Sequence, residues 1–325
     1  MSVTALPIGA TRQPSPALRK FAWGVLAYFI AVILWGTLVR ATGSGAGCGE
    51  HWPLCNGTVV QHSPRIDTVI EFTHRLTSGT SFFAVVGLLI WTYRGTDRGH
   101  LARGAAVAAV IFTLIEAILG AFLVKLGLTA QSTSPLRAPY LALHLTNTLL
   151  LLAALTLTAH MLSRARGYTR AGIRVVAPAG ALAAVIVVLV VGVTGSLAAL
   201  GDTLFPASSI GQALAQDFSA SSEWLVRWRW THPTVAFISS VFLIWLLVRA
   251  AHKPAGEKGY WDNRGLSALV LVLLAVQYVL GFLDVFLLAP VWLQVVHLLG
   301  ADVLWAGLVV LTARLTLVPI DGQRS

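Results

Sequence analysis

The chain has 325 residues, of which 56% are hydrophobic and 11% are charged. Soluble globular domains carry about 25% charged residues, so this composition excludes an ordinary water-soluble protein and indicates a membrane protein. The formal net charge is +10, but the basic residues gather in alternate loops, which argues against a nucleic-acid partner and for contact with anionic membrane lipid.

Eight apolar stretches follow one another along the chain, each long enough for a helix across a hydrocarbon core about 30 Å thick. They cover roughly residues 21–41, 68–92, 101–126, 138–162, 174–200, 231–250, 265–288 and 291–313. Long continuous apolar runs favour helices over the alternating strands of a β-barrel. The sequence therefore predicts an all-α polytopic membrane protein with eight transmembrane helices.

The distribution of positive charge predicts the topology. The N-terminal tail, the loops after the second, fourth and sixth helices and the C-terminus hold 16 of the 23 Lys and Arg residues. Cytoplasmic loops carry such an excess, so both termini are expected in the cytoplasm. The first apolar segment is too long for the core of a cleaved signal peptide and is expected to remain as a span.

The only two cysteines, Cys48 and Cys55, lie in the glycine-rich loop after the first helix. The topology places this loop on the outer side, where a disulfide persists. Two alternatives stay open for such a bond, a structural disulfide and a redox-active pair. A metal site is the weaker alternative, because His51 leaves only three nearby ligands and no clear fourth.

The two halves of the chain resemble each other. The matching segments are RATGSGAG and GVTGSLAA, FTHRLTS and WTHPTVA, IEAILGAFLV and VQYVLGFLDV, and YLALHLTNTLL and WLQVVHLLGAD. They align Thr42 with Thr194, His74 with His232, Glu116 with Gln277 and His144 with His297. The repeat predicts two tandem four-helix bundles, related by a pseudo-two-fold axis along the membrane normal. The predicted divisions are a tail at 1–20, halves at 21–163 and 174–316, a linker at 164–173 and a tail at 317–325.

Four histidines lie inside predicted helices near the outward end, at the equivalent positions His74, His144, His232 and His297. Ionisable groups within a membrane are rare and usually functional, although a single one is often a hydrogen-bonded core residue. Two imidazoles per half at one depth suit the axial ligands of a haem iron. The residues one turn further on are small, which leaves room for a flat macrocycle or for close helix packing. These residues are Ser78, Thr148, Ala236 and Ala301.

Next to the paired histidines, the first half is the more acidic of the two. Glu71 lies three residues before the first histidine, whereas the equivalent residue of the second half is Arg229, a cation suited to a haem propionate. Two interpretations of Glu71 stay open, a catalytic carboxylate and an interfacial one paired with Arg75 or Arg65. Glu116 is typical of a polar group in helix packing.

The chain resembles the haem A synthases, in particular their cysteine-containing bacterial branch, over roughly residues 20–315. The motifs that carry this similarity are TGSGAGCGEHWPLCNG (42–57), EFTHRLTSG (71–79), HLTNTLLLL (144–152), THPTVAF (231–237) and QVVHLLGADVLW (294–305). Members of that family convert haem O to haem A by oxidising a porphyrin methyl group to a formyl group through hydroxylated intermediates. The product goes to haem-copper terminal oxidases.

The resemblance implies two haem sites. A haem b cofactor is expected between His232 and His297, and the substrate haem O between His74 and His144, with both sites near the outer face of the membrane. A haem O synthase is the expected upstream partner. An electron donor is also required, and the motifs do not identify it.

The resemblance also implies roles for residues beside the histidines. Glu71 matches the essential acidic residue of the family. Cys48 and Cys55 match loop cysteines that are implicated in activity or haem transfer. Candidate propionate contacts are Arg75, Arg137 and Arg229.

Two other functions suit an eight-helix chain with paired histidines. A di-haem b electron-transfer protein would hold both haems permanently, but the contrast between Glu71 and Arg229 and the single depth of the four histidines argue against it. A transporter or haem exporter would have broken helices or polar residues at the midplane, where this chain has mostly Leu, Val and Ala. The polar loops 129–137 and 207–224 have no assigned role.

Overall fold

The computed structural model of the protein describes residues 13–58, 64–164, 168–176, 179–252 and 263–319. In this part of the chain, eight helices are long and apolar enough to cross a membrane, which confirms the predicted all-α fold with eight transmembrane helices. In the first half they are α1 (Pro16–Ala41), α2 (Ile66–Gly95), α3 (Leu101–Lys125) and α4 (Arg137–Ser163). In the second half they are α5 (Ala179–Leu204), α8 (Thr231–Ala251), α9 (Asn263–Phe286) and α10 (Val291–Thr316).

Short elements connect these helices. They are the 3₁₀ turn η1 (Ser44–Ala46), the helices α6 (Ile210–Phe218) and α7 (Trp224–Arg227), and the strands β1 (Ile173–Val175) and β2 (Leu317–Pro319). The strands pair antiparallel, with Arg174 opposite Val318. The predicted helix over 174–200 is therefore wrong at its start, because Arg174 and Val175 belong to a strand and α5 begins at Ala179.

Local sequence sets where two of the helices begin. Ser15 accepts a hydrogen bond from the backbone N–H of Leu18 and precedes Pro16, a residue pre-organised for the first helical position. His100 caps α3 in the same way, because its Nδ1 accepts a hydrogen bond from Ala102 N. Burial lowers the pKa of His100, and the neutral imidazole is the form that accepts this bond.

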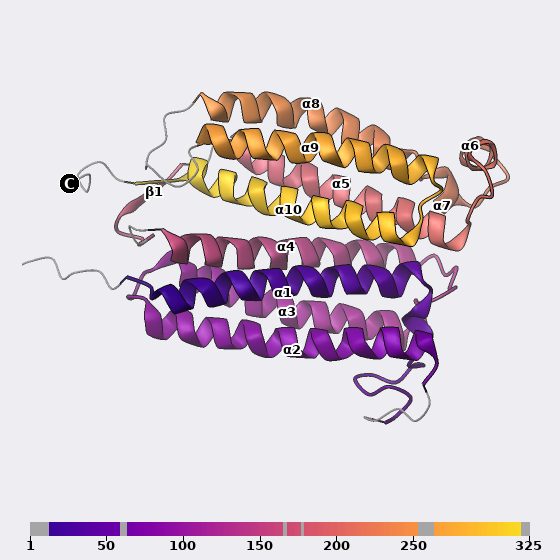
Figure 1. Ribbon diagram of the computed structural model, residues 1–325, viewed down its shortest axis with the longest axis horizontal. Coiled ribbons are helices and arrows are strands. Elements are labelled where there is room, and N and C mark those ends of the chain that lie inside the picture. The colour runs from indigo at the N-terminus through magenta and orange to yellow at the C-terminus, as the bar shows by residue number, and fades with distance from the viewer. Residues whose placement is uncertain (1–12, 59–63, 165–167, 177–178, 253–262, 320–325) are drawn as a thin grey trace, which may run out of the picture.

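The eight long helices form two four-helix bundles that lie side by side (Figure 1). In the first bundle, α1 packs on α2 and α4, and α3 packs on α2 and α4. In the second, α5 packs on α8 and α10, and α9 packs on α8 and α10. The helices thus follow one another around both bundles in the same cyclic order. The pseudo-two-fold axis and the division of the chain into tails, halves and linker stay predictions.

The bundles meet mainly through α4, which packs on both α5 and α10, and through α1, which packs on α10. Trp305 of α10 is buried in the central core, and its indole Nε1 donates a hydrogen bond to the Leu149 carbonyl of α4 at 2.8 Å. Half of the residues in the apolar 18-residue segment of α4 are buried, against 11% of the residues in the corresponding segment of α5. The last helix of the first bundle is therefore the centre of the whole molecule.

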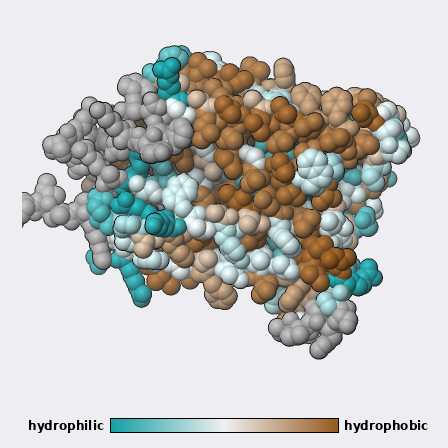
Figure 2. Space-filling view, in the orientation of Figure 1, coloured by the Kyte–Doolittle hydropathy of each residue, from teal (hydrophilic) through white to brown (hydrophobic). Residues whose placement is uncertain are grey.

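The outer surface carries large apolar side chains, among them Phe83, Val241 and Phe282, each more than half exposed. Figure 2 shows a broad hydrophobic area on one face, with hydrophilic residues toward the two ends of the helices. Such a surface suits lipid, whereas water-soluble monomers rarely expose an apolar patch of more than a few hundred Å². The structure and the sequence therefore agree on a multi-pass membrane protein.

Candidate functional site

All four histidines lie at one end of the helices, which we call the histidine end. His74 is near the start of α2 and His144 near the start of α4, while His232 and His297 are near the starts of α8 and α10. The helices α2 and α4 are diagonal partners in the first bundle, as are α8 and α10 in the second. The members of each pair interact electrostatically with each other. Each bundle therefore directs two imidazoles toward its own core.

A glycine of a neighbouring helix lies against each imidazole ring. A Cβ atom added to Gly36 of α1 would lie 3.0 Å from Cε1 of His74, and one added to Gly195 of α5 would lie 3.0 Å from Cε1 of His232. A Cβ atom added to Gly120 of α3 would lie 4.0 Å from Cε1 of His144, and one added to Gly281 of α9 would lie 3.5 Å from Cε1 of His297. The rings of His74 and His232 thus fill spaces that a larger side chain at Gly36 or Gly195 would close, whereas an added Cβ at Gly120 or Gly281 would make an ordinary van der Waals contact. Sequence reasoning missed Gly36 and Gly195 as partners, because Gly36 lies before the segment RATGSGAG that was matched to the segment containing Gly195.

The predicted alignment of Thr42 with Thr194 is wrong. Thr42 follows the last residue of α1, where its hydroxyl contacts the Leu38 carbonyl and Ser44. Thr194 lies inside α5, and its hydroxyl is 3.3 Å from Nδ1 of His232. The similar sequences around the two threonines therefore lie at different places in the fold, one at the end of α1 and the other inside α5. The glycines that contact the rings give the structural equivalence instead.

The ring nitrogens are suited to hold a haem iron. His74 Nδ1 and His144 Nδ1 are buried, and neither has a hydrogen-bond partner among the residues that the structure describes. Neutral imidazoles in a helical bundle are common axial ligands of haem iron. The chemistry of the donors and the glycine-lined space behind each ring fit a bis-histidine haem in both bundles, and the four ligand assignments stay predictions.

The carboxylate of Glu71 is buried and fixed from two sides. Its Oε2 accepts a hydrogen bond from the backbone N–H of Cys48 at 2.8 Å, and its Oε1 accepts one from Arg75. Arg75 also donates to the carbonyl oxygens of His51 and Leu54. Of the two pairings considered for an interfacial Glu71, the structure has the one with Arg75. A catalytic role of Glu71 stays a prediction.

The loop after α1 is closed by a disulfide between Cys48 and Cys55, and both residues are fully buried. The loop packs directly on the first turn of α2, where the hydroxyl of Thr68 donates to the Gly47 carbonyl at 2.7 Å. A Cβ at Gly47 would come within 2.5 Å of the α2 backbone, so this contact requires glycine. The disulfide, Glu71 and the first histidine pair therefore form one continuous region.

The three candidate propionate arginines have protein partners. Arg229 bonds Asp202 at 3.0 Å and Asp217 at 2.8 Å, which ties the start of α8 to α5 and α6. Arg137 donates to the Ala130 and Ser132 carbonyl oxygens and so closes the 129–137 loop. Arg75 binds Glu71 and the disulfide loop, as described above. Two arginines thus hold the loops for which the sequence gave no role, and their contact with propionates stays a prediction.

Sequence reasoning also missed Arg40, which joins the two bundles. From α1 it donates to the Ala199 carbonyl at 2.9 Å and the Thr203 hydroxyl at 2.8 Å, both on α5. It also donates to Oε1 of Gln294 on α10 at 2.7 Å. Arg40 lies one helical turn after Gly36, and Gln294 lies one turn before His297. A cation therefore spans the gap between the two histidine pairs.

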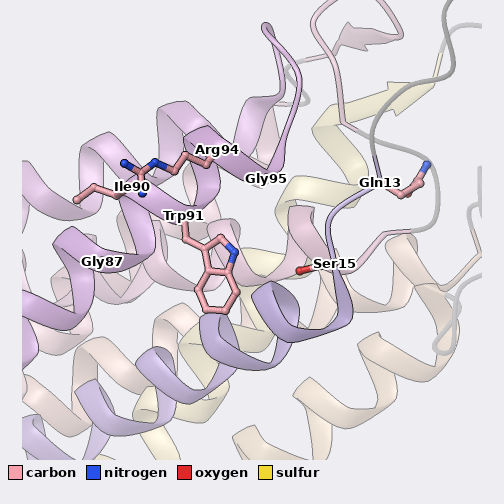
Figure 3. Close-up of a pocket in the computed structure, with 7 residues that line it drawn as sticks. All are labelled: Gln13, Ser15, Gly87, Ile90, Trp91, Arg94 and Gly95. Carbon is pink, nitrogen blue, oxygen red and sulfur yellow. The ribbon is translucent and has the colours of Figure 1, made fainter.

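A hollow of about 550 Å³ lies at the opposite end of the first bundle. Its lining residues are Gln13, Ser15, Gly87, Ile90, Trp91, Arg94 and Gly95 (Figure 3). Trp91 is 17 residues after His74 on α2, a separation of about 25 Å at 1.5 Å per residue. The hollow is thus separate from the histidine pairs.

Comparison with known proteins identifies the family. The COX15-CtaA family model, described as cytochrome oxidase assembly protein, matches residues 19–309. A protein of Thermus thermophilus named protoheme IX farnesyltransferase is 40% identical over 293 residues, which are 89% of this chain and 46% of that protein. The chain therefore spans about half the length of this relative.

Two relatives named heme A synthase match a shorter part of the chain. The one from Bacillus licheniformis is 41% identical over 99 residues, 30% of this chain and 32% of that protein. The one from Halalkalibacterium halodurans is 40% identical over 98 residues, 30% of this chain and 33% of that protein. With the family model covering most of its length, the chain belongs to the COX15-CtaA family of cytochrome oxidase assembly proteins, the family of the haem A synthases.

Proposed function

We propose that the protein is a haem A synthase, which oxidises a methyl group of haem O to a formyl group through hydroxylated intermediates. Family membership and the relatives named heme A synthase support this function. The observation that carries it is the buried carboxylate of Glu71, which lies one turn before His74 and is held by the disulfide loop. At the equivalent place the second bundle has Arg229, which is already paired with carboxylates.

In this proposal the histidine pairs divide the work. His74 and His144 hold the substrate haem O, and His232 and His297 hold a haem b cofactor. When bound, haem b supplies one-electron redox chemistry. The helices α4 and α10 fix the separation of the two pairs by packing on each other.

Glu71 acts on the substrate side. Its carboxylate is buried, held by Arg75 and the Cys48 N–H, and in this role it stabilises positive charge that develops at the porphyrin edge. It would also serve as a proton acceptor for the bound substrate. Cys48 and Cys55 keep the loop that positions Glu71 closed, and a redox role for them would act through the same loop.

The partners follow from the same assignment. A farnesyltransferase that acts on protoheme IX makes a farnesylated haem, the class of compound to which haem O belongs, and this chain matches 46% of a relative with that name. A haem O synthase is therefore the proposed supplier of substrate, and haem-copper terminal oxidases are the proposed recipients of the product. We place the protein in the bacterial cytoplasmic membrane, with cytoplasmic termini and the histidine end at the outer face.

The experiment is to express the protein in a host that makes haem O and has no haem A synthase of its own. Extracted pigments are then identified by chromatography with mass detection for the wild type and for Glu71→Gln. Wild type is expected to yield haem A or its hydroxylated precursor, and Glu71→Gln to lose both. Glu50→Gln is the matched control, because Glu50 is an exposed carboxylate of the same loop.

The alternative is a di-haem b electron-transfer protein, which the similar construction of the two histidine pairs favours. It would yield only haem b, at two per chain, from the wild type and from Glu71→Gln alike. That result would end the haem A synthase proposal.

A further inference from the structure

A second carboxylate, Glu116 of α3, lies beside His144 in the first bundle. A charged group inside a membrane helix is costly unless it is paired, and such groups are usually functional. Oε1 of Glu116 is 3.5 Å from Nδ1 of His144. That ring nitrogen has no hydrogen-bond partner among the described residues, and this carboxylate faces it.

The carboxylate is held in place by the same helix that carries the histidine. Asn147 Nδ2 donates to Oε2 of Glu116 at 2.5 Å, and the Thr148 hydroxyl donates to Oε1. Asn147 and Thr148 lie three and four residues after His144, so they share its face of α4. Glu116 is therefore fixed relative to the imidazole rather than free to turn toward lipid.

The second bundle lacks this arrangement. The repeat places Gln277 of α9 opposite Glu116, and its amide contacts the backbone of α10. With the amide oriented to satisfy both groups, Gln277 donates to the His297 carbonyl at 3.1 Å and accepts from Ala301 N at 3.2 Å. The equivalent side chain thus joins two helices, and these partners are backbone atoms rather than the imidazole.

We propose that Glu116 is a positioning residue for His144, an inference that rests on the proposed haem site between His74 and His144. A small rotation of the imidazole converts the 3.5 Å contact into a hydrogen bond from Nδ1–H to Oε1. This bond fixes the tautomer and presents the Nε2 lone pair to the iron of the substrate haem. A carboxylate partner also makes the imidazole a stronger electron donor, as in many histidine–metal sites.

The two haem sites consequently differ in their electronic properties. The haem held by His144 has an anionic group hydrogen-bonded to its ligand, which stabilises ferric over ferrous iron. The haem held by His297 has a neutral amide bonded to the helix backbone nearby. The inference predicts that Glu116 lowers the midpoint potential of the first haem and tightens its binding, with no comparable effect of Gln277 on the second.

The test uses the full-length protein and iron protoporphyrin IX as the probe. In a His232→Ala background only the first pair is complete, and haem affinity and midpoint potential are measured with and without Glu116→Gln. We expect binding to weaken by about 10–100-fold, the usual effect of removing such a partner, and the midpoint potential to rise. Gln277→Leu in a His74→Ala background is the matched control, expected to leave the potential of the second haem unchanged.

The possible outcomes distinguish an error in the role of Glu116 from an error in the proposed haem site. If the His232→Ala protein binds haem and Glu116→Gln changes neither affinity nor potential, the role of Glu116 is wrong and the haem site stands. If the His232→Ala protein binds no haem, the substrate site between His74 and His144 is wrong, and the inference falls with it. Misfolding is detected separately, because Glu116→Gln in the otherwise wild-type chain must still hold haem at the second pair.

Discussion

Asp302 of α10 is a buried acid with no role in the proposed chemistry. It is 1% exposed, and neither carboxylate oxygen has a hydrogen-bond partner within the described part of the chain. It lies three residues before Trp305, on the face of α10 that packs against α4. An unpartnered buried polar group costs about 1–3 kcal/mol of stability.

Replacing Asp302 by leucine is therefore expected to stabilise the protein, by about 1–3 kcal/mol, since it removes that cost and adds apolar surface at an apolar interface. The measurement is thermal unfolding in detergent. Asp217→Leu is the comparison, because that carboxylate pairs with Arg229 and its loss should destabilise the protein. A less stable Asp302→Leu protein would show that the acid has a partner, such as a bound ligand or a proton path.

For single residues, the sequence indicated which residue types matter but not which partners they contact. The position of the four histidines at one end of the helices was predictable, because ionisable groups are conspicuous in apolar segments, and their roles and that of Glu71 stay predictions. The contacts of Glu116 with His144 and of Arg40 with Gln294 were not predictable. They depend on the rotation of one helix about its axis relative to another, which hydrophobic patterns inside a lipid-exposed bundle leave undetermined.

Among the helices, close approach to an imidazole makes some glycines irreplaceable. Gly36→Ala would place a Cβ 3.0 Å from the ring of His74, so the ring must shift. Overpacking of this kind costs about 1–3 kcal/mol, and we expect a lower haem content at the first pair, measured as haem per chain by absorption. Gly24→Ala on the same helix is the control, because nothing lies within 4 Å of its added Cβ. Equal haem content in the two variants would contradict a ring pressed against α1.

The number of spanning helices was predictable, and their bounds mostly so. Runs of about 20 apolar residues have few alternatives in a membrane. The start of α5 was not predictable, because Arg174 and Val175 pair with a strand almost 150 residues later in the chain. The predicted equivalence of Thr42 and Thr194 is wrong for a related reason. A short similar sequence does not show where a helix ends.

For the molecule as a whole, Arg40 is the polar contact that unites the bundles at the histidine end. Arg40→Met removes hydrogen bonds to α5 and α10 and leaves Gln294 Oε1 without its donor. We expect a loss on the order of 3 kcal/mol, seen as a lower thermal unfolding temperature in detergent. Among the described residues, Arg65→Met removes only an exposed pair with Asp67 and should cost less than about 1 kcal/mol. Similar losses in both variants would mean that Arg40 does not join the bundles.

The central position of α4 also has a consequence for the order of synthesis. Glu116 contacts Asn147 and Thr148 on the very next helix, so this carboxylate has its partners once α4 has entered the membrane. The contacts of the first bundle with α10 come last, because Leu149 receives the Trp305 indole only from the eighth long helix. Chains fold from the N-terminus as they are made. A nascent chain can thus complete its first histidine pair while the second is still on the ribosome.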